Sequence, residues 1–313
     1  MTGTASSISV ALFFLSGFLL SSVFIARETD RESKFTIEAA SSRIEVTVDR
    51  TFPRIRDIQL KRWAQNAADA VVAYYGRYPV PHALLEIRSF DGRGVRGGRT
   101  FPLHGGLIRI AVGNETTEED LTTDWMLTHE MVHLTFPSMP EEHHWIEEGI
   151  ATYVEPIARI QAGQFNASRM WFELVRDMPK GLPQAGDQGL DHTHTWGRTY
   201  WGGALFCFLA DVEIRRKTQN KRGLEDALRG ILDAGGDMRE DWELEKALII
   251  GDRATGTDVL MKLYERMRNS PTEVDLGALW KELGIREESG AVQFEDDAPL
   301  ARIRKSITAR PEP

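Results

Sequence analysis

Two histidines four residues apart, His129 and His133, with Glu130 beside the first, constrain this chain more than any other feature. In an α-helix, residues four apart lie on one face about 6 Å apart along the axis, so both imidazoles can reach one metal ion. In this HExxH arrangement the histidines hold zinc, and the glutamate is the general base rather than a ligand. Two helical histidines can equally be surface or core residues, so the motif alone leaves both interpretations open.

The residues around the motif favour the metal-binding interpretation. Residues 116–120 read Thr-Thr-Glu-Glu-Asp, which is typical of a capped helix start, and Pro137 ends the helix after Phe136. We therefore expect one helix with the motif in its middle. One stripe of this helix would face the core and a neighbouring stripe would face a cleft. The first stripe holds Leu121, Trp125, Thr128, Val132 and Phe136, and the second holds Met126, His129 and His133.

Two further segments resemble known zinc peptidases. Residues 145–155, WIEEGIATYVE, resemble the helix of gluzincin peptidases in which the glutamate before the glycine is the third zinc ligand. Residues 200–218 are similar to a helix of the glycyl aminopeptidase family, in which a tyrosine stabilises the transition state. The resemblance implies Zn²⁺ held by His129, His133 and Glu148, with Tyr200 acting on the reacting carbonyl.

The motifs depart from the family in two respects. Fourteen residues, 134 to 147, separate His133 from Glu148, fewer than in the aminopeptidase N relatives, so this connection must be tight. Gly202 stands where the family has a lysine, and Glu147 stands where it usually has an asparagine. Both changes are expected to alter contacts with the substrate more than zinc binding.

Composition excludes some classes of function. A chain of 313 residues with 42% apolar composition can bury a substantial core in one domain or a two-lobed domain. The net charge of -9 and the lack of a long basic cluster argue against a nucleic-acid partner. The single cysteine, Cys207, cannot form an intrachain disulfide and is expected to be a buried packing residue.

Residues 8–26 form an uncharged run of nineteen residues, long enough to cross a bilayer as a helix. We interpret this run as a signal anchor or a signal peptide, although the basic residues that precede a cleavable signal are missing. Basic residues after the run favour a cytoplasmic body, but large domains can override that bias. The expectation is a single-pass membrane protein with an extracytoplasmic catalytic domain, or a secreted or periplasmic protein if the segment is cleaved.

Periodicity predicts the other elements. Strands are expected at residues 35–39, 43–48, 84–88 and 106–112, and helices at residues 58–75, 224–232, 256–267 and 276–283. The glycine-rich residues 92–98 lead into a strand rather than a helix, which argues against a phosphate-binding loop and favours a mobile hairpin loop. A weaker alternative is a lid whose arginines meet acidic groups of a substrate. The second ligand helix is expected to end near Glu155, before Pro156.

Four other polar residues each have two interpretations. His192 and His194 precede Tyr200 and either line the substrate cleft or lie exposed in a loop. Thr152 and Glu155 either orient a ligand histidine or lie on the helix surface. The sequence assigns none of the four a role.

The fold class that follows is α+β. We expect a zincin-like metallopeptidase domain with a small strand-rich amino-terminal lobe and a helical carboxy-terminal lobe, preceded by one hydrophobic helix. The expected parts are a signal anchor or signal peptide at residues 1–26, a linker at 27–34, the peptidase domain at 35–286 and a polar tail at 287–313. Within the domain, residues 35–115 would form the strand-rich lobe and residues 116–286 the helical lobe.

The expected function is zinc-dependent hydrolysis of peptide bonds in peptide or protein substrates. Glu130 would take the proton of the attacking water and pass it to the leaving amine, and Tyr200 would hydrogen-bond the oxyanion. Residues 101–109 contain glycines but no acid to grip a free amino terminus, so we expect an endopeptidase whose edge strand, residues 107–112, holds an extended substrate. The alternatives are an aminopeptidase of the glycyl aminopeptidase type, a small-molecule hydrolase, and a membrane-tethered metal-binding interaction domain without catalysis.

Overall fold

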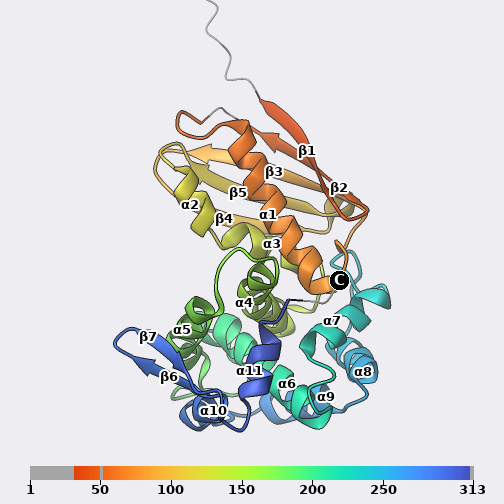
Figure 1. The fold of residues 1–313 in the computed structure, drawn as a ribbon. Helices are drawn as coiled ribbons and strands as arrows, with labels where there is room; N and C mark the ends of the chain where they lie inside the picture. Colours follow the sequence, from red (N-terminus) through yellow and green to blue (C-terminus); the bar gives the residue numbers. More distant parts are fainter. Residues whose placement is uncertain (1–31, 50–51, 311–313) are drawn as a thin grey trace, which may run out of the picture.

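A five-stranded mixed sheet forms the amino-terminal part of the computed structural model, which describes residues 32–49 and 52–310 (Figure 1). Its strands are β1 (Ser33–Ala39), β2 (Ser42–Val48), β3 (His82–Phe90), β4 (Val95–Phe101) and β5 (Leu107–Gly113). In space they follow the order β1-β2-β3-β5-β4. The three inner strands run parallel to one another, and both edge strands pair antiparallel.

The sheet buries one face, because apolar residues alternate along its strands. In β2, Ile44, Val46 and Val48 are buried while the residues between them are exposed or half-buried. Helix α1 (Asp57–Tyr75) packs against the sheet and ends at Gly76, whose φ of 76° closes the helix. Strands β1, β2, β3 and β5 and this helix lie where the periodicity of the sequence predicts them, whereas β4 was not predicted as a strand.

Helices form most of the rest of the chain. They are α2 (Glu118–Thr123), α3 (Met126–His133), α4 (His144–Gln161), α5 (Ala167–Asp177), α6 (Gly203–Lys217), α7 (Leu224–Asp233), α8 (Leu244–Thr255), α9 (Val259–Met267), α10 (Leu276–Glu282) and α11 (Ala301–Ile307). Helix α2 lies beside the sheet, and the helices from α4 onward lie below it in Figure 1. A short π-helix, Gly197–Gly202, leads directly into α6. The fold is therefore α+β, with a strand-rich amino-terminal sheet and a helical carboxy-terminal part.

The sequence predicted one helix through the HExxH motif, but Asp124 divides this region into two helices, α2 and α3. Its backbone is extended, with φ −62° and ψ 137°. Its carboxylate accepts hydrogen bonds from the backbone N–H groups of Met126 and Leu127, at 3.1 and 3.2 Å, and so caps α3. One result is that Trp125, predicted to face the core, is 49% exposed.

Helix α4 continues through Pro156, although the sequence predicted its end there. A proline inside a helix lacks the N–H that would bond the carbonyl oxygen four residues before it, and this normally ends or bends the helix. Its neighbours Val154, Ile157 and Ala158 are fully buried, so packing against the core offsets the missing bond.

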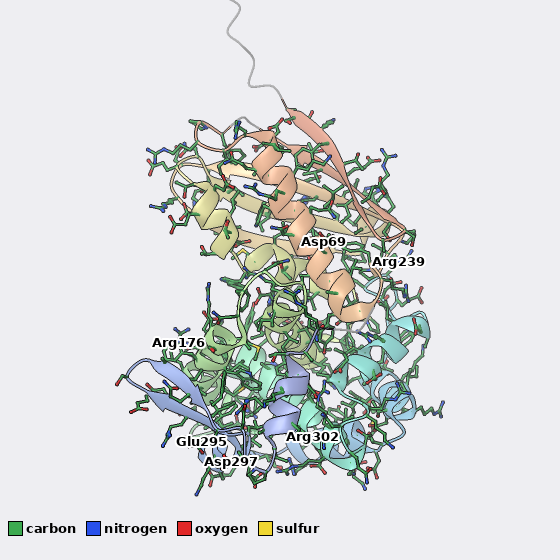
Figure 2. The ribbon with its side chains drawn as sticks, in the orientation of Figure 1. Asp69, Arg176, Arg239, Glu295, Asp297 and Arg302 are labelled. Atoms are coloured by element: carbon green, nitrogen blue, oxygen red, sulfur yellow. The ribbon has the colours of Figure 1, made fainter. Side chains whose placement is uncertain are left out.

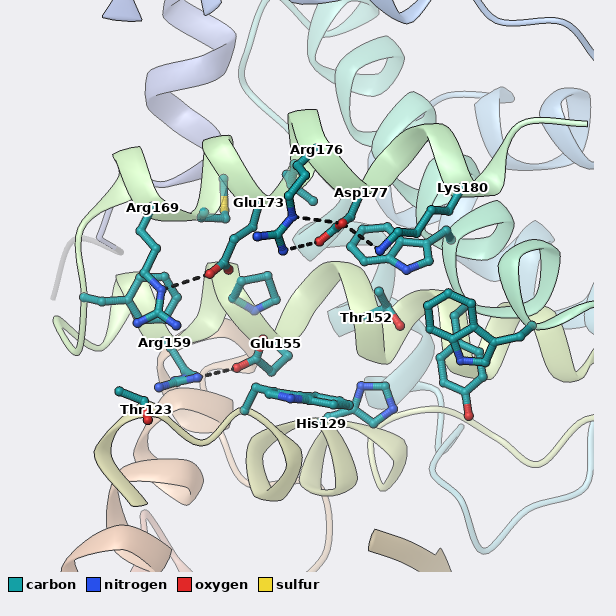
Figure 3. Close-up of a pocket in the computed structure, with 18 residues that line it drawn as sticks. Thr123, His129, Thr152, Glu155, Arg159, Arg169, Glu173, Arg176, Asp177 and Lys180 are labelled. Carbon is teal, nitrogen blue, oxygen red and sulfur yellow. Dashed lines mark hydrogen bonds and ion pairs between the residues drawn. The ribbon is translucent and has the colours of Figure 1, made fainter. Parts of the chain in front are cut away.

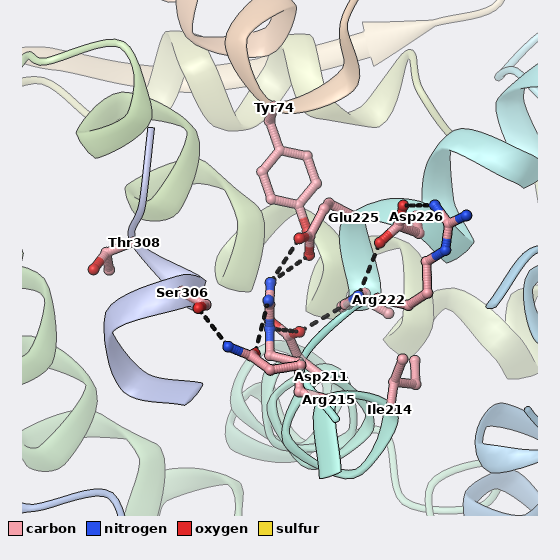
Figure 4. A network of polar contacts seen from close by, with 12 residues as sticks. Tyr74, Asp211, Ile214, Arg215, Arg222, Glu225, Asp226, Ser306 and Thr308 are labelled. Carbon is pink, nitrogen blue, oxygen red and sulfur yellow. Dashed lines mark hydrogen bonds and ion pairs between the residues drawn. The ribbon is translucent and has the colours of Figure 1, made fainter. Parts of the chain in front are cut away.

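A buried ionic network holds α6 against α4 and α7 (Figure 4). Arg215 Nε donates to Asp211 Oδ1 at 2.8 Å, and Arg215 Nη2 contacts both oxygens of Glu225 at 2.6 and 2.7 Å. The hydroxyl of Tyr153 on α4 donates to Asp211 Oδ2 at 3.0 Å. Removing one partner of such a pair typically costs about 3–5 kcal/mol, because the other charge stays buried. The two segments that resemble zinc peptidases are therefore joined directly.

The edge strand nearest the metal motif is β4, which corrects the prediction from the sequence. Residues 107–112 lie in β5, which pairs with β3 on one side and β4 on the other, so they cannot hold an additional strand. Residues 95–98, predicted as part of a mobile loop, begin β4. The pairing slips between Arg96 and Arg99, where β4 has one residue more than β5 and forms a bulge.

The carboxy-terminal segment is folded where the sequence predicted a loose polar tail. Strands β6 (Ile285–Glu288) and β7 (Ala291–Phe294) form a hairpin, and α11 follows. Ile303 and Ile307 of α11 are buried, and Arg304 Nη1 donates to the Leu283 carbonyl oxygen at 2.9 Å. The outer face of α11 is polar, as Arg302 shows, and so is that of α1 around Asp69 (Figure 2).

The helices of residues 32–49 and 52–310 do not combine the length and the apolar character that a bilayer span needs. The longest of them, α1, carries Asp57, Lys61 and Asp69 on its surface. We correct the predicted membrane localisation on this finding. Residues 8–26, which carry the predicted anchor and the hydrophobic helix of the expected fold, lie outside the described residues.

Candidate metal centre

Three side chains from two adjacent helices, α3 and α4, converge on one another. His129 Nε2 lies 3.1 Å from Glu148 Oε2, and His133 Nε2 lies 3.6 Å from the same oxygen. One ligand atom from each residue lies within 4.8 Å of the other two. The histidines are one turn apart on α3, and Glu148 lies on the first part of α4, which packs against α3. Together they form a group that can hold a metal ion.

The spacing and the donor types fit zinc. Zinc ligands lie about 2.0–2.2 Å from the ion, so two ligand atoms of a tetrahedral site are about 3.4 Å apart. The two distances to Glu148 Oε2, 3.1 and 3.6 Å, bracket this value. Two histidines and one glutamate, with a fourth position open, are a donor set of catalytic zinc sites.

The pKa shifts of His129 and Glu148 suit a metal. Burial lowers the pKa of His129. Burial opposes protonation of His133 as well, but its hydrogen bond with Glu148 and the nearby charges of Glu148, Glu130 and Glu147 together outweigh burial and raise its pKa. Burial favours the neutral acid at Glu148, yet hydrogen bonds with His129, His133 and His144 hold its pKa well below the usual range. A carboxylate and a neutral imidazole are the forms that ligation requires.

The group opens into a cavity of about 640 Å³, which we call the metal cleft. Residues 97–102, from β4 and the turn after it, line one side, and residues of α3 and α4 line the other. Tyr200 also borders the cleft. A chain lying in this cleft would therefore contact an exposed strand edge and the three converging side chains together.

Glu130 faces the metal cleft and is held by β4. Thr100 Oγ1 lies 2.7 Å from Glu130 Oε2 and 2.8 Å from the Glu130 carbonyl oxygen, and its single proton can be donated to either. A β-carbon at Gly98 would lie 2.5 Å from Glu130 Oε1, so a larger residue there would displace the carboxylate. The missing side chain at Gly98 thus leaves space for the Glu130 carboxylate.

Tyr200, on the π-helix, lies beside the first of the converging histidines. Its ring stacks on the His129 ring, with centroids 6.3 Å apart and planes 18° apart. Burial and the nearby Glu148 carboxylate raise the pKa of Tyr200 to about 12, so the hydroxyl carries its proton at neutral pH. π-Helical segments are frequent at functional sites, because the extra residue in the turn redirects a side chain.

Two glycines set the position of Tyr200 relative to Glu148. A β-carbon at Gly149 would lie 2.3 Å from the Gly203 carbonyl carbon, and one at Gly203 would lie 2.0 Å from the Trp145 carbonyl oxygen. The backbones of α4 and α6 therefore touch where they cross. Gly149 follows Glu148, and Gly203 follows the π-helix, so this crossing brings the two side chains to the same cleft.

His144, which the sequence did not single out as a site residue, contacts the third converging side chain. Its Nε2 lies 3.3 Å from Glu148 Oε1, and its Nδ1 lies 3.1 Å from Glu147 Oε2. These two contacts raise the pKa of His144 to about 10. Glu147 also accepts a hydrogen bond from the Met139 backbone N–H at 3.3 Å. The spacing of four between His144 and Glu148 was the available signal in the sequence.

His192, His194 and Glu155 do not line the metal cleft. His192 is exposed and lies 2.9 Å, at Nε2, from Asn269 Oδ1, and His194 is exposed as well. Glu155 pairs with Arg159 Nη1 at 2.7 Å instead of orienting a histidine. His143 is buried and bonds the Tyr264 hydroxyl at 3.0 Å. The loop before Tyr200 contributes a tryptophan, Trp196, rather than a histidine to the neighbourhood of the site.

The chain matches no family model, and no curated protein matches its sequence. Solved structures with a similar fold do exist. An aminopeptidase N family protein from Idiomarina loihiensis superimposes with a TM-score of 0.62 at 12% identity, over 86% of this chain and 53% of that chain. An M1 zinc metallopeptidase mutant from Deinococcus radiodurans gives 0.51 at 12% identity, over 78% and 53% of the two chains.

A two-domain M1 zinc metallopeptidase mutant bound to L-arginine gives a TM-score of 0.52, also at 12% identity, over 78% of this chain and 53% of that chain. The chain thus spans about half the length of the structures it resembles. At this identity the likeness shows the fold, which the chain shares with M1 zinc metallopeptidases. A particular specificity, such as that of glycyl aminopeptidases, does not follow from it.

Proposed function

We propose that this chain is a zinc-dependent peptidase. The observation that carries the proposal is the convergence of His129, His133 and Glu148 at a cleft that Glu130 also faces. The fold shared with zinc metallopeptidases supports it. A domain that held zinc only for structure would have no use for Glu130, a general base that lines the same cleft.

In this proposal His129, His133 and Glu148 hold the metal. Zinc, when bound, supplies a Lewis acid and lowers the pKa of water toward 7. Glu130 takes the proton of the attacking water and returns it to the leaving amine, and Thr100 keeps its carboxylate directed into the cleft. Tyr200, which carries its proton at neutral pH, donates a hydrogen bond to the oxyanion.

The substrate would lie along β4 as an added strand, with backbone hydrogen bonds giving affinity and the cleft walls giving specificity. Residues 97–102 contain no acid that could grip a free amino terminus, and Arg99 is exposed among them. Glu147, the other acid at this cleft besides Glu130 and Glu148, already accepts bonds from His144 and the Met139 N–H. These contacts support an endopeptidase rather than an aminopeptidase.

Acetylation of the substrate tests this choice. A peptide and its amino-terminally acetylated form are expected to be cleaved at the same internal bond and at similar rates, because no carboxylate is available for the free amine. Mass spectrometry of the products measures both. An informative variant is Arg99→Glu, which places a carboxylate on β4 and should favour the free amine over the acetylated peptide.

Release of single amino acids from the amino terminus, abolished by acetylation, would contradict the endopeptidase and favour an aminopeptidase. Absence of any cleavage by the zinc-loaded protein, across a mixed peptide library, would contradict the peptidase itself.

Thr100→Val removes the hydroxyl that contacts Glu130 and keeps the shape of the side chain. A hydrogen bond to a charged group contributes about 1.5–3 kcal/mol, so kcat should fall about tenfold or more, while KM and zinc content stay near those of wild type. Thr100→Ser restores a hydroxyl and should recover most of the rate. The control is Thr122→Val, which removes an exposed hydroxyl on α2 that donates to the Glu118 carbonyl oxygen and lies outside the metal cleft. Equal kcat for Thr100→Val and wild type would show that Glu130 needs no support from β4.

A further inference from the structure

A second cavity, of about 280 Å³, opens beside His129, one of the three converging side chains, and has no role in the reaction proposed above. We call it the side pocket. It lies between α4 and α5 (Figure 3). Trp125, His129 and Tyr200 line both the side pocket and the metal cleft, so the two cavities meet at the converging ligands. A substrate with its reacting bond at His129 can therefore extend into the side pocket.

Aromatic rings lead from the metal group to a lysine in this pocket. The Trp196 ring stacks on Tyr200 with centroids 5.7 Å apart, and Trp196 is 60% exposed. Lys180 Nζ lies 5.8 Å from the centre of the Trp196 ring and 5.7 Å from that of Trp201. The path from the Tyr200 ring to Lys180 Nζ thus has two steps, of 5.7 and 5.8 Å. Because an extended chain advances about 3.3–3.6 Å per residue, Lys180 is about two to four residues from a bond that reacts beside Tyr200.

The charges around the pocket do not balance. Two cations have a carboxylate each: Arg159 contacts Glu155 at 2.7 Å, and Arg169 contacts Glu173 at 3.0 Å. The remaining two, Arg176 and Lys180, share Asp177. Four cations thus face three carboxylates, and the excess positive charge lies at the end of the pocket that the tryptophans border.

The cations at this end keep donors free for a ligand. The side chains of Arg176 and Lys180 are 57% and 48% exposed, whereas that of Asp177 is 9% exposed. An ammonium group has three N–H donors, and Lys180 uses one of them on Asp177, at 2.7 Å. A positively charged pocket also stands out in a chain whose net charge is -9.

We propose that the side pocket binds a carboxylate of the peptide substrate, two to four residues from the cleaved bond, through Lys180 and with Arg176 beside it. The carboxylate belongs either to an acidic side chain or to the carboxyl terminus of the peptide. Trp196 and Trp201 cover the apolar part of the chain between that carboxylate and the reacting bond. The proposal rests on the proposed peptidase function and adds its substrate class.

Direct binding tests the pocket without requiring catalysis. The protein is the full chain loaded with zinc and carrying Glu130→Gln, so that bound peptide is not consumed. The probes are four acetylated tetrapeptides: Ala-Phe-Ala-Glu amide against Ala-Phe-Ala-Gln amide for the side chain, and Ala-Phe-Ala-Ala free acid against its amide for the terminus. Tryptophan fluorescence reports binding, since three tryptophans line the pocket.

In at least one of the two pairs, the acidic peptide is expected to bind about tenfold more tightly than the neutral peptide, because a charge-assisted hydrogen bond replaces a neutral one. Lys180→Met should remove the difference and Lys180→Arg should keep it. Asp177 keeps Arg176 as a partner in both variants. The matched control is Lys262→Met on α9, where Asp258 is likewise shared by two cations, both lysines, and keeps Lys217.

Two results would overturn the proposal: equal binding of both members of each peptide pair, or a preference for the acid that survives in Lys180→Met. If only the glutamate and glutamine peptides differ in affinity, the carboxylate comes from an acidic side chain. If only the free acid and its amide differ, it comes from the carboxyl terminus of the peptide. Failure of the proposed peptidase function appears differently, as absence of cleavage by the zinc-loaded wild-type chain, and leaves the binding result standing.

Discussion

Glu130→Gln is expected to lower kcat for peptide hydrolysis by about 10²–10⁴-fold, the contribution of a positioned general base, while the chain keeps one zinc ion. Glutamine preserves the shape of the side chain and can still accept the hydrogen bond from Thr100, but it cannot take a proton from water. Glu130 is not among the three converging ligand atoms, so zinc content should not change. Steady-state kinetics and metal analysis of the same preparation measure both quantities.

Replacement of the ligands separates metal loss from base loss. His129→Ala, His133→Ala and Glu148→Ala should each lose zinc and activity together, in contrast to Glu130→Gln. Glu142→Gln is a suitable control, because Glu142 is exposed and does not line the metal cleft. Full activity of Glu130→Gln on a peptide that wild type cleaves would rule out the assigned base.

Tyr200→Phe is expected to lower kcat by about 10²–10³-fold, the usual effect of removing one oxyanion donor. The change deletes only the hydroxyl, so the stacking of the ring on His129 and the zinc content should persist. KM should change little, because the proposed hydrogen bond forms in the transition state.

Tyr78→Phe provides the matched control for Tyr200→Phe. It removes a buried hydroxyl that has no hydrogen-bond partner among the described residues, so neither kcat nor zinc content should change. If Tyr200→Phe retains the wild-type kcat, the oxyanion donor is a different group, and His144, which lies in the same cleft, becomes the next candidate to test.

The sequence predicts those parts of this protein that depend on neighbours along the chain. Strands β1 and β2 and helix α1 follow from alternation and helical periodicity, because burial of one face imposes those periods. The same holds for His129 and His133, whose convergence needs only one turn of helix. The resemblance of residues 145–155 to a known ligand helix added Glu148, which lies beside both histidines.

The parts that were not predicted depend on contacts between distant segments. The Asp124 carboxylate accepts hydrogen bonds from the first backbone N–H groups of α3 in place of carbonyl oxygens of a continuous helix, and Trp125 next to it lines the metal cleft. The order of strands places β4 rather than β5 at the edge, and no local pattern distinguishes an inner strand from its neighbour. The side pocket requires α4, α5 and the segment around Trp196 to meet, which no single stretch of sequence contains.

The exposed edge of β4 also matters for how copies of this chain behave in concentrated solution. Among the described strands, β4 pairs with β5 alone, and a free edge is a template for the strand of another copy. The bulge between Arg96 and Arg99, together with the charges of these exposed arginines, hinders such pairing. If β4 binds the substrate as proposed, solubility and substrate binding depend on the same strand, and Arg99→Glu is expected to alter both the substrate preference and the tendency of the chains to aggregate.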